Sequence, residues 1–144
     1  LENGLMFGSV VFRLSAAAPE NMTLFVVGAK PVRLRRLDID FNSGGNTIWQ
    51  LYLNPAVTAN GTAVPGINRN TLSPVAPTAV LYDAPTVSGL GTLIDSFLTT
   101  AANRAPLNPI DAQWKLQPGD RLLVRRVNTG AGSETAIRVR WTEE

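Results

Sequence analysis

Residues 135–142 read Thr-Ala-Ile-Arg-Val-Arg-Trp-Thr, so that apolar and polar side chains alternate along them. In an extended chain, successive side chains point to opposite faces, which places the isoleucine, valine and tryptophan opposite Arg138 and Arg140. Such alternation is typical of a strand with one face in a core and the other in solvent. The segment therefore predicts a half-buried strand near the end of the chain.

Similar runs elsewhere predict further strands and two hairpins. Residues 121–128 precede the last strand across a glycine-rich turn at 128–132, and we expect these two strands to pair. Residues 47–54 also alternate, and they follow the alternating residues 36–41 across a turn at 42–46. A turn of this composition between two alternating runs is typical of a hairpin, so the sequence predicts another one here.

The apolar faces of these strands predict one hydrophobic core. Near the start of the chain, Val10, Phe12 and Leu14 share a face of an additional strand. Ten prolines and twelve glycines interrupt the chain, and no window of helical length between them has convincing helical spacing. The residues expected to meet in the core are Phe12, Leu37, Ile39, Phe41, Trp49, Leu51, Leu123 or its neighbour Leu122, Val139 and Trp141.

A long segment between the two predicted hairpins has a different composition. Residues 55–85 are rich in Pro, Asn, Thr, Ala and Gly, and they contain only short apolar pieces. We expect an extended, weakly packed excursion with two short strands, because this composition buries little apolar surface. Long loops in compact domains usually carry function or form an arm that another chain orders. Residues 90–100 fit either a strand, with Leu93 and Phe97 inside, or a short helix.

Length and pattern together define the expected fold class. A chain of 144 residues is long enough to bury one hydrophobic core without disulfides. Many short strands in a chain of this size are typical of a two-sheet architecture. The sequence predicts a single all-β domain over residues 1–144, an antiparallel two-sheet β-sandwich similar to a jelly roll, in which residues 55–85 form a long loop or arm.

Composition excludes several classes of function. The chain has no cysteine and no histidine, which removes thiolate metal sites and the commonest general base. It also lacks a phosphate-binding glycine loop and a Gly-x-Ser-x-Gly motif. We therefore predict no enzymatic activity, no cofactor and no metal. A net charge of only +2 does not favour direct nucleic-acid binding, and the longest apolar stretch, residues 22–29, is too short to cross a membrane.

The acidic residues offer one arrangement that could carry chemistry. Asp38 and Asp40 share a strand face about 7 Å apart, which is compatible with acid-base work or a cation site. The alternative is that both belong to the solvated face opposite Leu37 and Ile39, where they would pair with Arg36 or with an arginine of a neighbouring strand. We favour the ion-pair interpretation, because no other acid stands at a convincing spacing.

Arginine supplies most of the positive charge and indicates a surface for protein contact. Its planar head pairs in bidentate fashion with carboxylates and is common at protein interfaces, whereas a simply solvated face more often uses lysine. A protein-facing or intrachain ion-pair role is the favoured interpretation, with a solvated face and nucleic-acid contact as alternatives. The interface candidates on the last strands are Arg125, Arg138 and Arg140.

Some of the aromatic residues are expected in the core, and others are candidates for an exposed surface that binds a ligand. Trp49 and Trp141 fall on the apolar faces of their strands and are expected in the core. Trp114 stands before a Pro-Gly-Asp turn, outside any alternating run. Because exposed aromatic rings stack on sugars and other flat ligands, Trp114 and Tyr82 are the residues of an alternative ligand platform.

Several short runs, taken in order, resemble one known family. They are Asn42-Ser-Gly-Gly-Asn46, Leu51-Tyr-Leu-Asn-Pro-Ala-Val-Thr58, Gly61-Thr-Ala-Val-Pro-Gly-Ile-Asn-Arg-Asn70, Trp114-Lys-Leu-Gln-Pro-Gly-Asp120, Leu122-Leu-Val-Arg125 and Trp141-Thr-Glu-Glu144. In order and spacing these runs are similar to those of small tailed-bacteriophage capsid cement proteins, also called decoration or head-stabilising proteins. The resemblance covers roughly residues 36–144; Ala56 stands where the family often has threonine, and residues 103–109 look like an insertion.

The resemblance implies a structural protein of the virion. Such a protein would sit on the capsid exterior as a symmetric trimer or dimer, with the major capsid protein as its partner, and would stabilise the shell by bridging capsid subunits. The polar contact candidates on the arm are Asn54, Asn68, Arg69 and Asn70, although Asn68 and Asn70 fit turn capping equally well. The alternative function is a receptor- or carbohydrate-binding β-sandwich of a phage tail or adhesin, which would use Trp114 or Tyr82.

Overall fold

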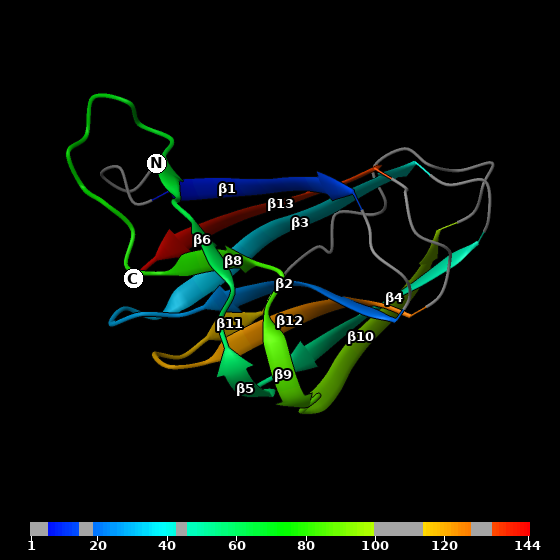
Figure 1. Cartoon of the computed structure of the whole chain (residues 1–144). Helices are drawn as coiled ribbons and strands as arrows, with labels where there is room; N and C mark the ends of the chain where they lie inside the picture. Colours follow the sequence, from blue (N-terminus) through cyan, green and yellow to red (C-terminus); the bar gives the residue numbers. More distant parts are fainter. Residues whose placement is uncertain (1–5, 15–18, 43–45, 100–113, 128–133) are drawn as a thin grey trace.

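The chain folds into two antiparallel β-sheets that pack against each other, as a β-sandwich does (Figure 1). The computed structural model describes residues 6–14, 19–42, 46–99, 114–127 and 134–144. All regular structure in these residues is strand, which confirms the predicted fold class. In the same ranges, no helix is long and apolar enough to span a membrane.

The first sheet has five strands in the order β11-β3-β13-β1-β7. Their bounds are Lys115–Leu116, Val32–Asn42, Glu134–Glu143, Met6–Leu14 and Ile67–Asn68. The second sheet has six strands in the order β10-β4-β12-β2-β8-β6, with bounds Thr92–Thr99, Thr47–Leu53, Arg121–Arg126, Glu20–Val26, Val80–Asp83 and Thr62–Val64. Two short strands, β5 (Ala56–Ala59) and β9 (Thr86–Gly89), pair only with each other.

The core forms between the two sheets from the alternating residues. Trp141 packs its ring against Phe25 at 4.9 Å between centroids, and Trp49 packs edge-on against Phe41 at 5.3 Å. Leu122 belongs to the core, and Leu123 on the other side of its strand is buried too. The other predicted core residues are also buried, except Phe12: Leu37, Ile39, Phe41, Trp49, Leu51, Val139 and Trp141.

The prediction for the first strand chose the wrong face. Val10, Phe12 and Leu14 point outward and are 50%, 67% and 63% exposed. Both faces of β1 carry large apolar side chains, so alternation alone could not decide which face is buried. The buried face includes Ser9 and Arg13, and each finds a polar partner inside: Ser9 donates to the Val64 carbonyl oxygen, and Arg13 pairs with acidic side chains of the second sheet.

Neither predicted hairpin exists, although the strands that were to form them do. β3 and β13 lie in the first sheet, whereas β4 and β12 lie in the second. The chain therefore crosses from one sheet to the other between β3 and β4, and again between β12 and β13. Alternation identifies the buried face of a strand but not its partner, and both a hairpin and an inter-sheet crossing use Gly- and Asn-rich turns.

The segment 55–85 is more integrated than its composition indicated. It contributes β5, β6, β7 and β8, and its Ala79 and Leu81 are each 1% exposed. Only residues 69–79 contain no strand, and most of the side chains there are exposed. Residues 92–99 form a strand and not a helix; Phe97 packs against the core, while a bulge leaves Leu93 49% exposed.

An internal repeat builds the tip of the sandwich formed by β5 and β9. Residues 53–62 and 83–92 share Pro, Val, a hydroxyl residue, Gly and Thr at equivalent positions. The residues before the two prolines, Asn54 and Ala84, both have φ of 56°. The hydrogen bonds are reciprocal, because the Thr58 hydroxyl donates to the Thr86 carbonyl oxygen and the Ser88 hydroxyl to that of Ala56. The two halves are thus related by a local pseudo-two-fold axis, and the sequence signal for it is the repeated pattern of Pro, Val, Gly and Thr.

Alanine at either repeat glycine is expected to destabilise the fold by roughly 2–4 kcal/mol. Gly61 and Gly91 have φ of 100° and 81°, and a Cβ there would overlap the carbonyl oxygens of Asp83 and Leu53. Gly119 is the matched control: its φ is 88°, but a Cβ there would meet nothing within 4 Å. Urea unfolding should show Gly119→Ala losing only about 1 kcal/mol. Equal losses at all three positions would contradict the close packing of the repeat.

Candidate functional site

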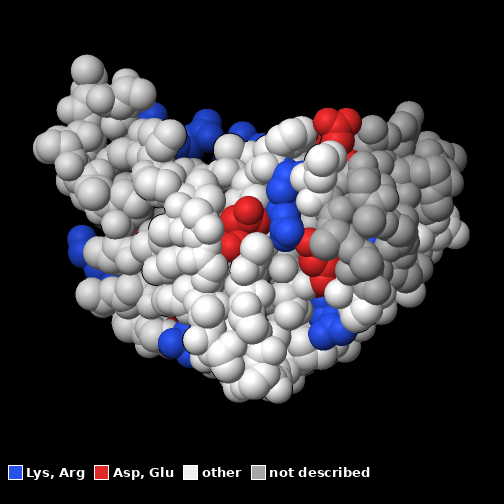
Figure 2. Space-filling model, viewed as in Figure 1, with Lys and Arg blue, Asp and Glu red and all other residues white. Residues whose placement is uncertain are grey.

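On the face of the molecule shown in Figure 2, the charged side chains do not gather into one patch. The face shown in Figure 2 is mostly uncharged, with a few acidic and basic side chains interspersed. Asp38 and Asp40 both pair with arginines, as the ion-pair interpretation predicted, but Asp38 is 3% exposed and not on a solvated face as expected. Arg36 donates to Asp38 at 2.9 Å, and Arg138 on the neighbouring strand reaches Asp40 at 2.6 Å. In the described ranges, no three acidic side chains lie close enough together to hold a metal ion.

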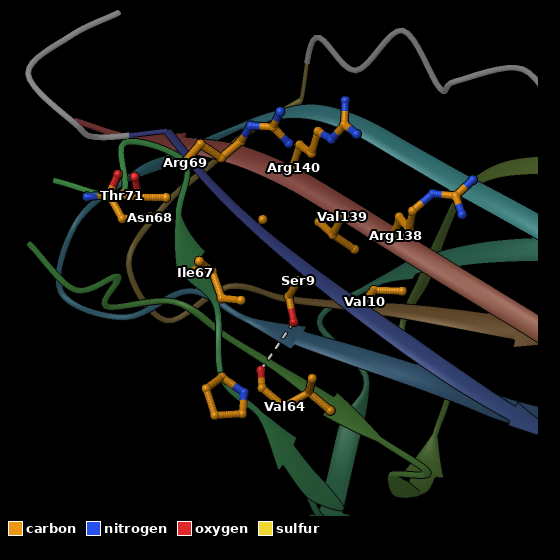
Figure 3. Close-up of a pocket in the computed structure, with 12 residues that line it drawn as sticks. Ser9, Val10, Val64, Ile67, Asn68, Arg69, Thr71, Arg138, Val139 and Arg140 are labelled. Carbon is orange, nitrogen blue, oxygen red and sulfur yellow. Dashed lines mark hydrogen bonds between the residues drawn. The ribbon is translucent and has the colours of Figure 1, made fainter. Parts of the chain in front are cut away.

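A cleft of about 480 Å³ lies beside β1, next to the segment that leads from β6 through β7 (Figure 3). Gly8 lies along it and leaves room because it has no side chain. Apolar side chains, including Val10 and Ile67, line one part of the cleft. Three arginines line another part: Arg69, Arg138 and Arg140. A site with both apolar side chains and arginines in its lining suits a ligand that carries carboxylates beside apolar groups.

Two of the three cleft arginines have no acidic partner in the part of the chain that the structure describes. Arg138 is paired with Asp40 and lies 4.0 Å from Asp38, whereas no ion pair among the described residues involves Arg69 or Arg140. Arg140 also stands opposite Arg36 in the β13–β3 register, an unfavourable like-charge neighbour. An anionic group entering the cleft would relieve this repulsion, so the cleft favours acidic ligands.

The loop after β7 owes its shape to asparagine side chains. The Asn68 side-chain amide donates to the Val75 carbonyl oxygen at 2.9 Å, and its Oδ1 accepts from the Asn70 backbone N–H at 2.9 Å. Asn70 Oδ1 in turn accepts from the Leu72 N–H at 3.1 Å. Asn68 and Asn70 therefore cap turns, as the alternative interpretation held. The Arg69 backbone N–H donates to the Met6 carbonyl oxygen, which fixes Arg69 at the cleft.

A buried glutamate from the last strand fastens the far end of this loop. The Glu143 side chain is 2% exposed and accepts hydrogen bonds from the Thr78 N–H and hydroxyl, the Ala79 N–H and Trp141 Nε1, all between 2.9 and 3.1 Å. Gly66 packs so closely on the Trp141 ring that a Cβ would come within 2.9 Å of it. The terminal Trp-Thr-Glu run thus positions the loop that carries Arg69.

Of the seven interface candidates, the fold brings four together in this cleft: Asn68, Arg69, Arg138 and Arg140. Asn70 lines an adjoining hollow of about 370 Å³ inside the loop. Asn54 is elsewhere, where its side chain joins the end of β4 to Asp120 and to the Arg121 N–H. Arg125 lies on β12 in the second sheet, outside the cleft.

The two residues of the alternative platform do not lie together. Trp114 adjoins β11 at the edge of the first sheet and is 36% exposed. Tyr82 is half-buried on β8 of the second sheet. The aromatic ring pairs found in the described ranges involve neither residue.

Sequence reasoning missed the apolar side of the surface, because Phe12 and its neighbours had been assigned to the core. The sequence signal was available in the same strand, since the opposite phase also carries Phe7 and Val11. The chain matches no model of a known protein family, and no curated protein matches it.

Proposed function

We propose that this chain is a structural virion protein that binds the exterior of a bacteriophage capsid and stabilises it by bridging capsid subunits. The observation that carries the proposal is the cleft in which Arg69 and Arg140 lack an acidic partner among the described residues. The order of the motifs that resemble capsid cement proteins supports the same assignment. The major capsid protein is the proposed partner, and an acidic segment of its outer surface is the proposed ligand of the cleft.

The physical requirements of such a role agree with the architecture. A protein that bridges subunits needs a rigid body, a fixed contact surface and charge-assisted hydrogen bonds, and it needs no catalytic group. The sandwich provides the body, and Glu143 and the asparagine caps fix the loop that carries Arg69. Individually weak contacts sum when an oligomer docks on a repeating lattice, because each further contact forms at high effective concentration.

Replacing Arg69 or Arg140 by alanine is expected to weaken binding to phage heads about tenfold for each substitution, because each removes a charge-assisted contact. Arg125→Ala is the matched control for Arg140→Ala, since Arg125 and Arg140 are both half-buried strand arginines but Arg125 lies outside the cleft. The assay is cosedimentation with heads of the phage whose genome encodes the chain, after removal of the resident protein. Wild-type binding should also weaken as salt rises.

Equal losses from Arg125→Ala and from the cleft variants would contradict the cleft as the contact site. Full binding by the Arg69→Ala/Arg140→Ala double variant would do the same. If the wild-type protein bound glycans and not heads, the receptor- or carbohydrate-binding alternative would replace the proposal.

A further inference from the structure

The outward face of β1 carries a row of large apolar side chains. Val10, Phe12 and Leu14 are at least half exposed, and Phe12 is 67% exposed. They follow one another at every second position, so they form one continuous strip along the strand. Contiguous exposed apolar strips on soluble domains mark surfaces that another molecule covers.

The backbone edge beside this strip is open as well. β13 pairs with β1 from Met6 to Leu14, but on the other edge β7 covers only Phe7 and Gly8. Because the Met6 carbonyl accepts from Arg69 on that edge, the N–H and C=O groups of every second residue after Met6 point the same way. Those of Val10, Phe12 and Leu14 therefore point at the open edge, and no hydrogen bond from the described residues reaches them there.

Most of the usual devices that protect a strand edge are missing from β1, residues 6–14. Its register with β13 has no bulge, and residues 6–14 contain neither proline nor lysine. Its one charged residue, Arg13, points inward, which is itself a protective device. The charge of Arg13 is however compensated by ion pairs with Glu20 and Asp83. The unpaired N–H and C=O groups of such an edge can form hydrogen bonds with a strand of another chain.

We propose that two copies of this chain pair edge to edge through antiparallel β1 strands, around a two-fold axis at Phe12. Phe12 then stands opposite Phe12 of the second copy, and Val10 opposite the second copy's Leu14. This register uses the whole open length, because β7 occupies the edge at Gly8. It satisfies the outward N–H and C=O groups of all three residues and joins the two five-stranded sheets into one.

The occupant is a second copy because the strip is complementary to itself. A two-fold interface requires one patch to fit its own rotated image, and the apolar side chains lie symmetrically about Phe12. On β13, Arg138 lies beside Val10 and Glu134 beside Leu14. In the dimer, Val10 of one copy would lie beside Leu14 of the second copy. Arg138 of the first copy and Glu134 of the second copy would then flank this pair on its two sides, so that opposite and not like charges flank it.

This pairing deepens the proposed function by giving the expected oligomer a surface and a geometry, but it does not depend on capsid binding. Val10 also lines the arginine cleft. The dimer therefore places two clefts on one joined sheet, on either side of the axis. Two clefts held at a fixed separation suit a repeating lattice, since binding through both sums weak contacts.

A single-cysteine experiment tests the pairing in solution, without phage heads. The chain has no cysteine of its own, so Phe12→Cys introduces the only thiol. Directly paired residues in antiparallel strands have Cα atoms about 4.5–5.5 Å apart, which a disulfide can bridge. We expect Phe12→Cys to form a covalent dimer on mild oxidation. The matched control, Leu72→Cys at a position 92% exposed in the loop, should remain monomeric at the same concentration.

Charge substitutions at Phe12 provide a second test of the pairing, through the affinity of the dimer. Phe12→Glu should weaken the dimer about a hundredfold in sedimentation equilibrium, because two carboxylates would face each other at the axis. Mixing Phe12→Glu with Phe12→Lys should restore a dimer. A wild-type chain that is monomeric at tens of micromolar, or cross-linking of Phe12→Cys no faster than that of Leu72→Cys, would overturn the pairing. Neither result would bear on whether the protein binds heads.

Discussion

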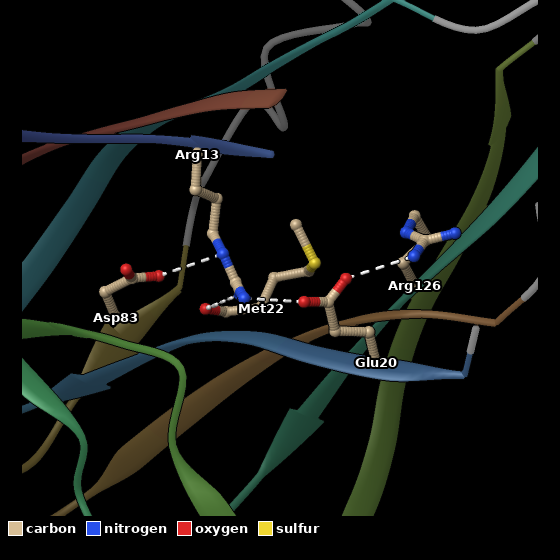
Figure 4. Close-up of polar contacts among 5 residues, drawn as sticks. All are labelled: Arg13, Glu20, Met22, Asp83 and Arg126. Atoms are coloured by element: carbon tan, nitrogen blue, oxygen red, sulfur yellow. Dashed lines mark hydrogen bonds and ion pairs between the residues drawn. The ribbon is translucent and has the colours of Figure 1, made fainter. Parts of the chain in front are cut away.

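Replacing Glu20 by alanine is expected to destabilise the fold by about 3–5 kcal/mol, because it removes the carboxylate shared by two inward-pointing arginines. The Arg126 side chain is fully buried and donates to Glu20 at 3.0 Å, while Arg13 reaches the same carboxylate at 2.6 Å (Figure 4). Arg13 has a second acid, Asp83, at 3.4 Å. The Arg126 side chain is fully buried, whereas that of Arg13 is 18% exposed, so the charge of Arg126 would lose more from the missing carboxylate.

The complementary substitution Arg126→Met should cost much less. Glu20 would keep its ion pair with Arg13, and the methionine side chain would fill the space beside the Phe41 ring, over which Arg126 now lies at 5.9 Å. Replacing a buried charge by an apolar group of similar size is often close to neutral. Urea unfolding of both variants measures the asymmetry. If Arg126→Met lost as much stability as Glu20→Ala, the shared-carboxylate account of this cluster would be wrong.

Replacing Glu143 by alanine is expected to cost about 3–4 kcal/mol and also to weaken head binding. The substitution leaves two backbone N–H groups, a hydroxyl and the Trp141 indole N–H without their acceptor, in a place from which water is largely excluded. It also releases the loop that holds Arg69 at the cleft. Thermal unfolding and cosedimentation with heads measure the two effects separately.

The adjacent glutamate provides the control for this substitution. Glu144 is exposed, and its hydrogen bond with Lys115 lowers the pKa of its carboxyl group, with Arg33 adding to the effect. Glu144→Ala should therefore have a much smaller effect on stability and none on head binding. Loss of binding in both variants would indicate a general requirement for acidic charge at this end of the chain, not a clamp at Glu143.

Local pattern was sufficient for the strands but not for their arrangement. The alternation of Ile137, Val139 and Trp141 predicted a strand and its buried face, and both were confirmed. The same reasoning placed Phe12 in the core, because β1 is apolar on both faces and alternation alone cannot decide which face is buried. Alternation also did not predict which strands pair, since the chain crosses from one sheet to the other at both places where a hairpin was expected.

For the candidate site too, the sequence predicted individual residues but not how the fold brings them together. Arg138 and Arg140 were recognised as outward-facing on one strand, and Asn68 and Arg69 as polar residues of the long segment. Their meeting in one cleft depends on the pairing of β7 with β1, a contact between residues about sixty positions apart in sequence. No local pattern encodes such a contact. The roles of Asn68 as a turn cap and of Glu143 as a clamp likewise depend on partners that only the fold brings near.

The proposed binding to the outside of a phage capsid can be tested by examining purified phage particles produced in a host that carries the gene for this chain. Quantitative mass spectrometry of intact particles, with antibody labelling in electron micrographs, would measure copy number and position. We predict a fixed ratio to the major capsid protein and labelling over the whole head surface. Absence from the particles, or a few copies confined to the tail, would contradict the account.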